Sequence, residues 1–369
     1  MKKLFYLVYR IFFNLGRLLP QNEKLVALVS PHNASFNDSL GEVKRVLEEK
    51  GGFEFLLISS AEIRGKASFF GVIRFFTLKA MALARAKYIF LNDNFMPMAD
   101  LNFKKGTVIT QLWHGEGALK KIGLHVNQPE EIKKRELRLY SKYTYLVCSS
   151  PAVVPIYAEA FNMPESRVLP LGSARTDALY RPFDYKAERA AFDLKYPECK
   201  GKKLAVYAPT FRDDPEKDGA LMSHFDIDAF NRRFGDEYAL IIRLHPQVHA
   251  PADLTGAVDA TGYGNIGQLL QLCDLLITDY SSICMDFVLL RKPCIFYAFD
   301  LEYYNSSRSF YSDYRTLVPG KIAEDFPALL DAIADPELDE QKLSDFTAYH
   351  FGTPDGKAAE RVVKAVMGI

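Results

Sequence analysis

A histidine flanked by glycine follows an apolar segment in the first half of the chain. Residues 111–123 read Gln-Leu-Trp-His-Gly-Glu-Gly-Ala-Leu-Lys-Lys-Ile-Gly, and His114 comes directly after Trp113. Imidazole titrates near neutral pH and can take a proton from an attacking hydroxyl, while glycines let a ligand approach the backbone. The segment therefore predicts either a general base or a structural histidine satisfied by a backbone carbonyl.

Two basic side chains end a strand-like segment in the second half of the chain. Arg243 and His245 occupy alternate positions of Arg-Leu-His-Pro, so both point to the same face of the strand. Both side chains can donate hydrogen bonds to a phosphate. The alternative is an arginine that forms a surface pair with a carboxylate.

Hydroxyl groups follow two further strand-like segments. Ser281 and Ser282 come after Asp279 at the expected start of a helix, where free backbone N–H groups favour an anion. Simple helix capping is the alternative. Thr210 and Arg212 offer a hydroxyl and a guanidinium after another strand. A further polar cluster lies at Gly172, Arg175 and Asp177.

Alternating strand and helix patterns must position these side chains. Strand-like apolar runs that alternate with helical stretches predict two doubly wound α/β domains that face one another across a cleft. Ligands of such sheets bind beyond the carboxyl ends of the strands, which is where the polar motifs fall. The expected strands are 24–30, 53–59, 88–91, 107–111, 204–207, 238–244, 275–278 and 293–297. The expected parts are a helix in 1–22, domains at 23–165 and 183–335, a linker at 166–182 and a helical closure at 336–369.

Two segments have the composition of helices that lie on a membrane. In residues 1–22 apolar side chains recur at helical spacing, while Arg10 and Arg17 interrupt the run, which argues against a secretion signal or a membrane span. Residues 63–92 hold six basic residues, interleaved phenylalanines and no acidic residue. The first pattern fits a helix that lies in a membrane interface, and the second favours contact with an anionic membrane surface. Helices packed on the protein's own core are the alternative in both cases.

Composition and missing motifs exclude several classes of protein. The chain has 369 residues, with 46 basic and 46 acidic side chains, and this neutral balance argues against a nucleic-acid-binding protein. Its five cysteines form no C-x-x-C pair, so they indicate neither a zinc site nor a redox motif. No carboxylate cluster resembles a metal clamp. A P-loop kinase and a simple dehydrogenase are not supported, because both glycine-rich phosphate motifs are absent.

Six short motifs occur in order along the chain. They are Trp-His-Gly, Leu-Lys-Lys-Ile-Gly, Gly-x-x-Arg-x-Asp, Ala-Pro-Thr-Phe-Arg, Arg-x-His-Pro and Thr-Asp-Tyr-Ser-Ser. Together with the aromatic segments at 292–304 and 310–314, this combination resembles the CDP-glycerol glycerophosphotransferase family. Members of that family build wall teichoic acid and related polymers at the inner face of the bacterial membrane. The resemblance implies a GT-B fold and a peripheral enzyme at the cytoplasmic face of the cell membrane.

The resemblance also implies a reaction and a set of site residues. An acceptor hydroxyl would attack the β-phosphorus of CDP-glycerol, and CMP would leave. No tightly bound cofactor is expected. His114 would be the general base, and His245 and Arg243 would hold the pyrophosphate of the donor. The acceptor would be an undecaprenyl-diphosphate-linked saccharide or a glycerol-phosphate polymer. The donor pocket would be completed by Gly115, Glu116, Gly117, Ala118, Arg175, Pro209, Thr210, Ser281, Ser282 and Asp286.

One departure from the family pattern bears on the acceptor. Many polymerases read His-Gly-Thr-Pro-Leu-Lys, whereas His-Gly-Glu-Gly-Ala-Leu-Lys here is one residue longer. This version looks more like the single-unit primases, which attach the first glycerol phosphate to a lipid-linked disaccharide. A CDP-ribitol donor, a GT-B glycosyltransferase that uses a sugar nucleotide, and a non-catalytic binding protein are the alternatives.

Overall fold

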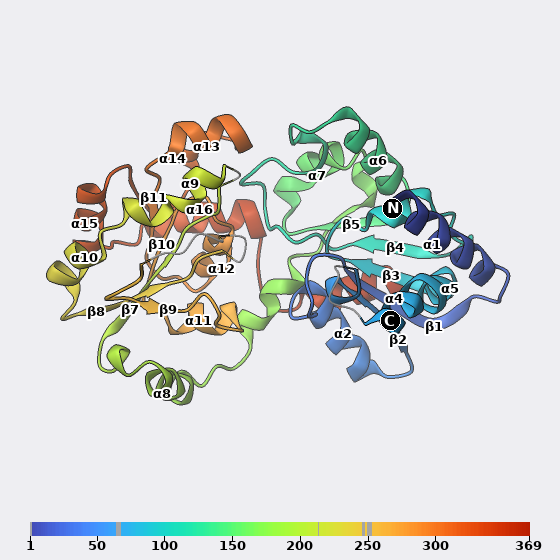
Figure 1. Ribbon diagram of the computed structural model, residues 1–369, viewed down its shortest axis with the longest axis horizontal. Coiled ribbons are helices and arrows are strands. Elements are labelled where there is room, and N and C mark those ends of the chain that lie inside the picture. The colour runs from blue at the N-terminus through green and yellow to red at the C-terminus, as the bar shows by residue number, and fades with distance from the viewer. Residues whose placement is uncertain (1, 64–67, 213, 246–247, 249–252) are drawn as a thin grey trace. The chain divides into compact units, whose positions relative to one another are not determined.

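The chain folds into two α/β units, each built on its own sheet (Figure 1). The computed structural model describes residues 2–63, 68–212, 214–245, 248 and 253–369. The first unit comprises Met1–Tyr180 and Ala348–Ile369, and the second comprises Arg181–Thr347. The predicted α/β class is therefore confirmed.

The first unit contains a parallel sheet of six strands within the described residues, in the order β2-β1-β3-β4-β5-β6. Each of the four strands predicted here is present. The strands are β1 (Asn22–Ser30), β2 (Glu54–Ser59), β3 (Ala86–Leu91), β4 (Val108–Gln111), β5 (Tyr145–Cys148) and β6 (Val168–Pro170). The helices are α1 (Lys2–Arg17), α2 (Ser39–Lys50), α3 (Ser60–Ile63), α4 (Phe69–Arg74), η1 (Phe75–Lys79), α5 (Ala80–Arg85), η2 (Met96–Asp100), η3 (Gly123–His125), α6 (Glu130–Tyr140), η4 (Pro151–Val153), α7 (Val154–Ala160), η5 (Glu165–Arg167), η6 (Ala174–Tyr180) and α17 (Ala358–Met367).

Local sequence explains how the first sheet and its helices form. Strand β1, which lies between β2 and β3, is buried on both faces from Leu25 onward, as expected for a parallel strand covered by helices on both sides. Helix α2 begins where the Asp38 side chain accepts a hydrogen bond from the backbone of Leu40, and it ends at Gly51, whose φ is 72°. Helix α17 packs beside α2 and buries Val362 and Val363 in the same core.

Helix α1 lies against α5 and η1. It buries Tyr9 and Phe13, and its Gly16 allows close approach, because a Cβ there would lie 2.4 Å from the carbonyl oxygen of Met81. The packed-helix alternative from the sequence therefore holds for this inner face. The outer face remains apolar and exposed, as Ile11 is 50% exposed. Arg64 and Lys66 of the predicted basic stretch lie outside the described residues.

The second unit contains a second parallel sheet, in the order β12-β11-β10-β7-β8-β9. Its four predicted strands are present as β7, β8, β10 and β11. The strands are β7 (Lys203–Ala208), β8 (Tyr238–Ile242), β9 (Val258–Asp259), β10 (Leu275–Thr278), β11 (Cys294–Tyr297) and β12 (Lys321–Ala323). The helices are α8 (Tyr185–Lys195), η7 (Pro197–Cys199), α9 (Pro215–Gly219), η8 (Leu221–His224), α10 (Ile227–Phe234), α11 (Ile266–Leu272), α12 (Ile283–Leu289), α13 (Leu301–Arg308), α14 (Tyr314–Leu317), α15 (Phe326–Ala334) and α16 (Glu340–Phe351).

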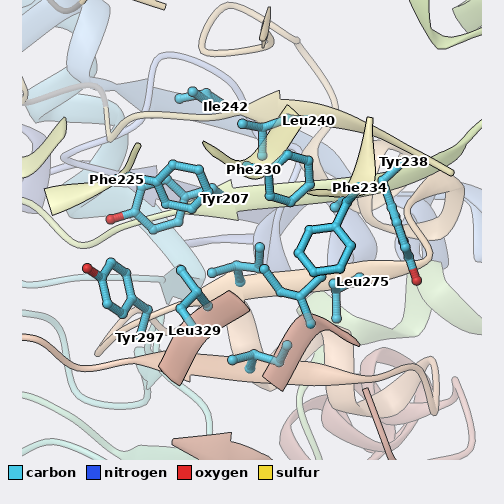
Figure 2. Packing of buried hydrophobic residues seen from close by; sticks show 14 of the residues in the cluster. Tyr207, Phe225, Phe230, Phe234, Tyr238, Leu240, Ile242, Leu275, Tyr297 and Leu329 are labelled. Atoms are coloured by element: carbon cyan, nitrogen blue, oxygen red, sulfur yellow. The ribbon is translucent and has the colours of Figure 1, made fainter. Parts of the chain in front are cut away.

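Aromatic side chains fill one face of the second sheet (Figure 2). The ring of Tyr207 stacks on Phe225 with centroids 4.5 Å apart, and Phe230 packs beside Phe234 at 5.6 Å. Offset and tilted ring contacts of this kind add to the stabilisation that burial provides. This core holds the strands whose carboxyl ends carry the polar motifs.

The linker predicted at 166–182 was wrong. Strand β6 pairs with β5 in the first sheet, and Asp177 accepts hydrogen bonds from the backbone N–H groups of Ala358 and Ala359, at the start of α17. Proline and glycine in this segment mark a short edge strand and turns, because proline is tolerated at an edge. The predicted closure at 336–369 is also divided between the units, since the boundary at Thr347 falls within α16.

Within the described part of the chain, no helix combines the length and the apolar character that a membrane span requires.

Candidate active site

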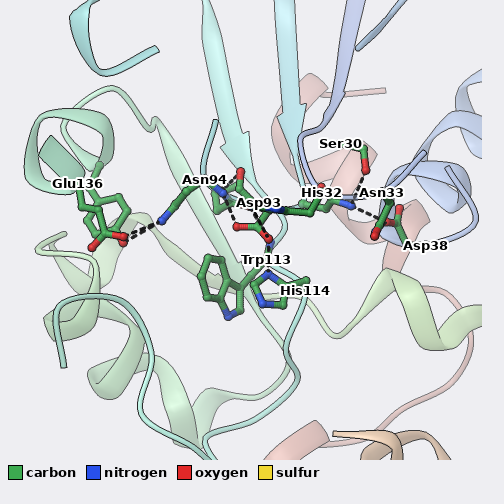
Figure 3. Close-up of polar contacts among 12 residues, drawn as sticks. Ser30, His32, Asn33, Asp38, Asp93, Asn94, Trp113, His114 and Glu136 are labelled. Carbon is green, nitrogen blue, oxygen red and sulfur yellow. Dashed lines mark hydrogen bonds and ion pairs between the residues drawn. The ribbon is translucent and has the colours of Figure 1, made fainter. Parts of the chain in front are cut away.

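Three neighbouring strands of the first sheet bring two histidines to one carboxylate (Figure 3). Strands β1, β3 and β4 end at Ser30, Leu91 and Gln111. His32, Asp93 and His114 follow these ends within a few residues. Because the carboxyl ends of adjacent parallel strands lie along one edge, side chains far apart in the sequence meet there.

The His114 side chain has the geometry of a general base. Its Nδ1 lies 3.3 Å from Oδ2 of Asp93, and the side chain is 52% exposed. A neutral imidazole that donates its Nδ1 proton to a carboxylate keeps a lone pair on Nε2 for a substrate proton. The Nε2 of His32 lies 3.6 Å from the same Asp93 oxygen, so one carboxylate serves two imidazoles.

The backbone before His114 is strained. Trp113 adopts φ of 61°, a left-handed conformation that large side chains rarely take and that clusters at functional sites. Its N–H donates to Oε1 of Gln111, whose amide nitrogen donates to the backbone oxygen of Asp93. The glutamine thus fixes both the turn that presents His114 and the segment that presents Asp93. The Trp113 ring packs beside the imidazole with centroids 4.3 Å apart.

A partly buried hydrogen-bond network holds the residues next to Asp93. The Asn94 amide donates to Glu136 and to the hydroxyl of Tyr140, both at 3.2 Å, and its oxygen accepts from Tyr143. Burial raises the pKa of Glu136 above its ordinary value, against the opposing effect of its hydrogen bonds. On the other side, Asn92 donates to Ser30 at 3.2 Å. Such networks fix side-chain positions because an unmet buried polar group is costly.

A second buried histidine supports the loop after His114. The Nδ1 of His350 accepts a hydrogen bond of 3.1 Å from the backbone N–H of Ala118, and burial lowers the pKa of His350 to about 4. Gly117 adopts φ of 60°, and a Cβ there would lie 2.1 Å from His350 Nδ1. Only glycine fits this position. The Tyr157 hydroxyl hydrogen-bonds with the carbonyl oxygens of Gly115 and Gly117.

The predicted donor residues Glu116 and Arg175 form a pair with one another. Glu116 is buried, and its Oε1 accepts from Nε of Arg175 and from the hydroxyl of Ser173, both at 2.8 Å. Burial alone would raise the pKa of Glu116, but the Arg175 guanidinium and the Ser173 hydroxyl hold it below its ordinary value. Glu116 therefore anchors this loop through Arg175 and Ser173. Asp177, from the same predicted cluster, caps α17 instead of facing a ligand.

In the second unit, Arg243 is held by backbone carbonyl groups. Its Nη1 donates to the carbonyl oxygens of Ala260 and Tyr263, both at 2.9 Å. Burial lowers the pKa of the Arg243 side chain. Among the described residues no carboxylate forms an ion pair with this guanidinium, so the alternative of a surface pair is not found. His245 is exposed, and its ring lies 4.7 Å from Phe211.

A buried ion-pair network lies at the ends of β7 and β10. Arg212 donates to Asp279 at 2.9 Å and to both carboxylate oxygens of Asp300. Its guanidinium also lies over the rings of Tyr280 and Tyr304. The expectation that Arg212 offers its guanidinium to a ligand was wrong, because the Arg212 side chain is only 1% exposed. Burial would lower its pKa, but the two carboxylates raise it above its ordinary value.

The hydroxyl residues surround this network. The backbone N–H of Thr210, next to Pro209, donates to Asp279 at 2.8 Å. The side-chain oxygen of Thr210 has no hydrogen-bond partner among the described residues. Ser281 and Ser282 precede α12, and the Ser281 hydroxyl accepts from the N–H of Ile283 at 3.3 Å. Asp286 is buried in the first turn of α12. Within the described residues, no group of three or more His, Cys, Asp or Glu is arranged to hold a metal ion.

One protein family matches the chain along nearly its whole length. The family described as CDP-glycerol:poly(glycerophosphate) glycerophosphotransferase matches residues 11–368. The chain belongs to this family. It is therefore an enzyme of the teichoic acid phosphotransferase family, and the resemblance inferred from the motifs is confirmed.

Two relatives illustrate the range within the family. The teichoic acid ribitol-phosphate primase of Bacillus spizizenii is 32% identical, over 94% of this chain and 92% of its own length. The teichoic acid glycerol-phosphate primase of Bacillus subtilis is 29% identical, over 78% of this chain and 76% of its own length. The chain spans only 54–59% of the length of the ribitol-phosphate polymerases that it also matches.

A solved structure of the wall teichoic acid polymerase TagF has the same fold. It superposes with a TM-score of 0.80 at 22% identity, over 98% of this chain and 92% of that chain. The predicted GT-B class is thereby confirmed for this member of the glycerophosphotransferase family.

The sequence alone did not identify three residues of this site: His32, Asp93 and His350. Asp93 follows the apolar run of β3 as His114 follows that of β4, so the same strand-end rule would have found it. His350 lies 232 residues from its partner Ala118, and no local pattern marks it. The predicted residues are divided between the two units. The first unit holds His114, Gly115, Glu116, Gly117, Ala118 and Arg175. The second unit holds Pro209, Thr210, Arg243, His245, Ser281, Ser282 and Asp286.

Proposed function

We propose that this protein transfers glycerol phosphate from CDP-glycerol to a hydroxyl of a lipid-linked saccharide or a teichoic-acid-type polymer and releases CMP. The observation that carries the proposal is the pairing of His114 Nδ1 with Asp93 at 3.3 Å, at the carboxyl ends of adjacent strands. Family membership supports a phosphotransferase, and the pair supplies the base that such a reaction needs.

In the proposed reaction, Nε2 of His114 takes the proton of the acceptor hydroxyl. The acceptor oxygen then forms a bond to the β-phosphorus of the donor. The bond from this phosphorus to the bridging oxygen breaks, and CMP leaves with the electron pair. Asp93 keeps Nδ1 protonated and stabilises the imidazolium that forms. General-base catalysis of this kind contributes about 10²–10⁴-fold in rate.

Charge neutralisation on the donor falls to the second unit. Arg243 suits the diphosphate, because the carbonyl groups that orient its guanidinium leave the positive charge uncompensated. His245, Ser281 and Ser282 would donate further hydrogen bonds to phosphate oxygens. CDP-glycerol acts as a substrate in this scheme, and no tightly bound cofactor takes part. Positioning and electrostatic stabilisation dominate phosphoryl transfer in general.

Ribitol phosphate is the second candidate for the transferred group. The ribitol-phosphate primase of Bacillus spizizenii is 32% identical and matches along 92% of its length, which favours this donor. Both candidates share the CDP leaving group and the proposed base, so the polyol pocket alone would distinguish them.

We also propose that the protein binds peripherally to the cytoplasmic face of the membrane. The support is the exposed apolar face of α1, where Leu7 is 48% exposed and Ile11 50%, together with Leu78, which is 63% exposed, in the adjacent η1. Amphipathic helices with such faces bind at membrane interfaces, aided by anionic lipids. Flotation with anionic liposomes should recover the protein and should weaken with salt. Failure to float at low salt would contradict this proposal.

A panel of donors tests the proposed function. Purified protein is mixed with a lipid-linked disaccharide and with CDP-glycerol, CDP-ribitol or a UDP-sugar, and nucleotide release is measured. CMP release that depends on the acceptor is expected with a CDP-polyol. UDP release from the sugar nucleotide without a response to either CDP-polyol would instead indicate a glycosyltransferase.

A further inference from the structure

Two adjoining pockets lie beside α1 in the first unit and share Tyr6 as a lining residue. The aromatic pocket, which includes Tyr6, Tyr9, His32, Phe76 and Phe95, has a volume of about 350 Å³. The basic pocket, which includes Tyr6, Arg10, Asp100, Lys134, Arg135 and Arg138, has a volume of about 760 Å³. Both volumes fall in the range of small-molecule sites.

One residue that lines the aromatic pocket contacts the Asp93 carboxylate. His32 lines this pocket, and its Nε2 lies 3.6 Å from the Asp93 oxygen that also contacts His114. A molecule bound against His32 in the aromatic pocket therefore lies near the carboxylate that contacts the proposed base. The donor residues of the second unit play no part in forming this pocket.

The lining of the aromatic pocket suits a sugar better than a hydrocarbon chain. The turn of π-helix at η1 places Phe76 against Phe5 and Tyr9, and such turns are frequent at functional sites. The Tyr9 hydroxyl is buried and has no hydrogen-bond partner among the described residues. A buried polar group without a partner is costly. A sugar presents a ring face to aromatic side chains and a hydroxyl to Tyr9, whereas a hydrocarbon chain would leave that hydroxyl unpaired.

The basic pocket suits an anion. It is lined by four cationic and two acidic side chains, so its charge is positive. Asp100 lies 3.5 Å from Arg138 and 4.0 Å from Arg135. The Arg135 guanidinium lies over the ring of Tyr6 at 4.3 Å, and its Nε is buried without a hydrogen-bond partner among the described residues. Clustered arginine and lysine side chains of this kind bind phosphate groups.

We propose that the two pockets together form the acceptor site. The basic pocket binds the diphosphate of a lipid-linked saccharide, and the aromatic pocket binds its sugar rings, so that the terminal hydroxyl reaches His32 and His114. This inference rests on the proposed phosphotransferase function and adds the location and chemistry of the acceptor. Because the diphosphate and the reacting sugar occupy adjoining pockets, the site selects short saccharides, as a primase requires.

Neighbouring lysines of α6 test the basic pocket. Lys134 lines it and Lys133 does not, so Lys134→Gln and Lys133→Gln remove the same charge from the same helix. Two water-soluble acceptors are used without membranes: a disaccharide on a short-chain prenyl diphosphate, and the same disaccharide as an uncharged alkyl glycoside. Lys134→Gln should raise the KM for the diphosphate acceptor by about fivefold and leave the KM for the alkyl glycoside unchanged. Addition of Arg10→Gln to Lys134→Gln should raise the KM for the diphosphate acceptor further.

Two tyrosines test the aromatic pocket. Both Tyr9 and Tyr207 bury a hydroxyl that has no partner among the described residues, and Tyr207 lies in the core of the second unit. Tyr9→Phe should raise the KM for both acceptors by several-fold while the thermal midpoint does not fall. Tyr207→Phe should leave the KM for both acceptors unchanged.

The outcomes separate this inference from the proposed function. If the native protein releases no CMP from either CDP-polyol, the proposed function is wrong. If the native protein is active but Lys134→Gln changes neither KM, or Lys133→Gln changes the KM values equally, the acceptor site is wrong while the function stands. An unchanged KM in Tyr9→Phe likewise overturns the sugar subsite.

Discussion

Charged side chains lie at the carboxyl edges of both sheets, but they are exposed in the first unit and buried in the second. In the first unit, His114 is 52% exposed and shares one carboxylate with His32. In the second unit, Arg212 and Asp279 are each 1% exposed and form a closed network with Asp300. Charged side chains at strand ends therefore have two different functions. The exposed imidazole of His114 can exchange a proton with a substrate, whereas the buried ion pairs hold the loops in place.

The largest expected effect is the loss of the buried network. Arg212→Met leaves two carboxylates in the interior without their cation, and breaking such a pair costs about 3–5 kcal/mol in the free energy of unfolding. Urea denaturation followed by tyrosine fluorescence would measure it. The matched control is Arg233→Met, because Arg233 pairs with Asp331 on the surface, where their side chains are 43% and 76% exposed. That pair should contribute under about 1 kcal/mol. An equal loss of unfolding free energy in the two variants would show that the buried network stabilises the fold no more than a surface ion pair does.

Asp93→Asn should affect catalysis and not stability. The asparagine amide can donate to Nδ1 of His114 and so favour the tautomer whose Nε2 already carries a proton. We expect kcat to fall by about 10²-fold, within the range for general-base catalysis, with an unchanged thermal midpoint. Glu159→Gln is the control, since Glu159 contacts His125 at 3.6 Å in the same unit. A loss of stability without a loss of kcat would make Asp93 structural, like Asp279.

His350 makes the first unit sensitive to acid. Burial lowers its folded-state pKa from 6.5 to about 4, so the unfolded chain binds the extra proton between these values. This contribution to stability is complete above pH 6.5 and falls as pH drops toward 4, by about 2 kcal/mol at pH 5. His350→Asn should retain the hydrogen bond from Ala118 and flatten the difference in thermal midpoint between pH 7.5 and 5. An unaltered pH profile would show that His350 is not the titrating group.

The smallest expected effect is that of His32→Gln. Glutamine keeps a polar group near Asp93 but removes one imidazole from the shared carboxylate, so kcat/KM for the acceptor should fall by about fivefold. Steady-state kinetics with varied acceptor would measure it. A loss as large as that of a His114 variant would mean that His32 is the base, and the roles of the two histidines would be exchanged.

The sequence predicted the main strands and the position of His114 because apolar runs and the residues after them are local signals. It failed at short edge strands such as β6, where Pro170 and Gly172 read as a linker. It also misjudged Arg212, since the carboxylate of Asp300 lies 88 residues away. Pairing across such separations decides whether a charge faces a ligand or a buried partner, and no local pattern encodes it.

The most direct test of the account is the turnover of His114→Asn. The asparagine amide can still contact Asp93, whereas the Nε2 lone pair is lost. CMP release from the preferred CDP-polyol, with a lipid-linked disaccharide as acceptor, would be measured beside the thermal midpoint and the KM for the donor. The account predicts a kcat lower by about 10²–10⁴-fold with the other two values unchanged. Turnover close to that of the native protein would contradict it.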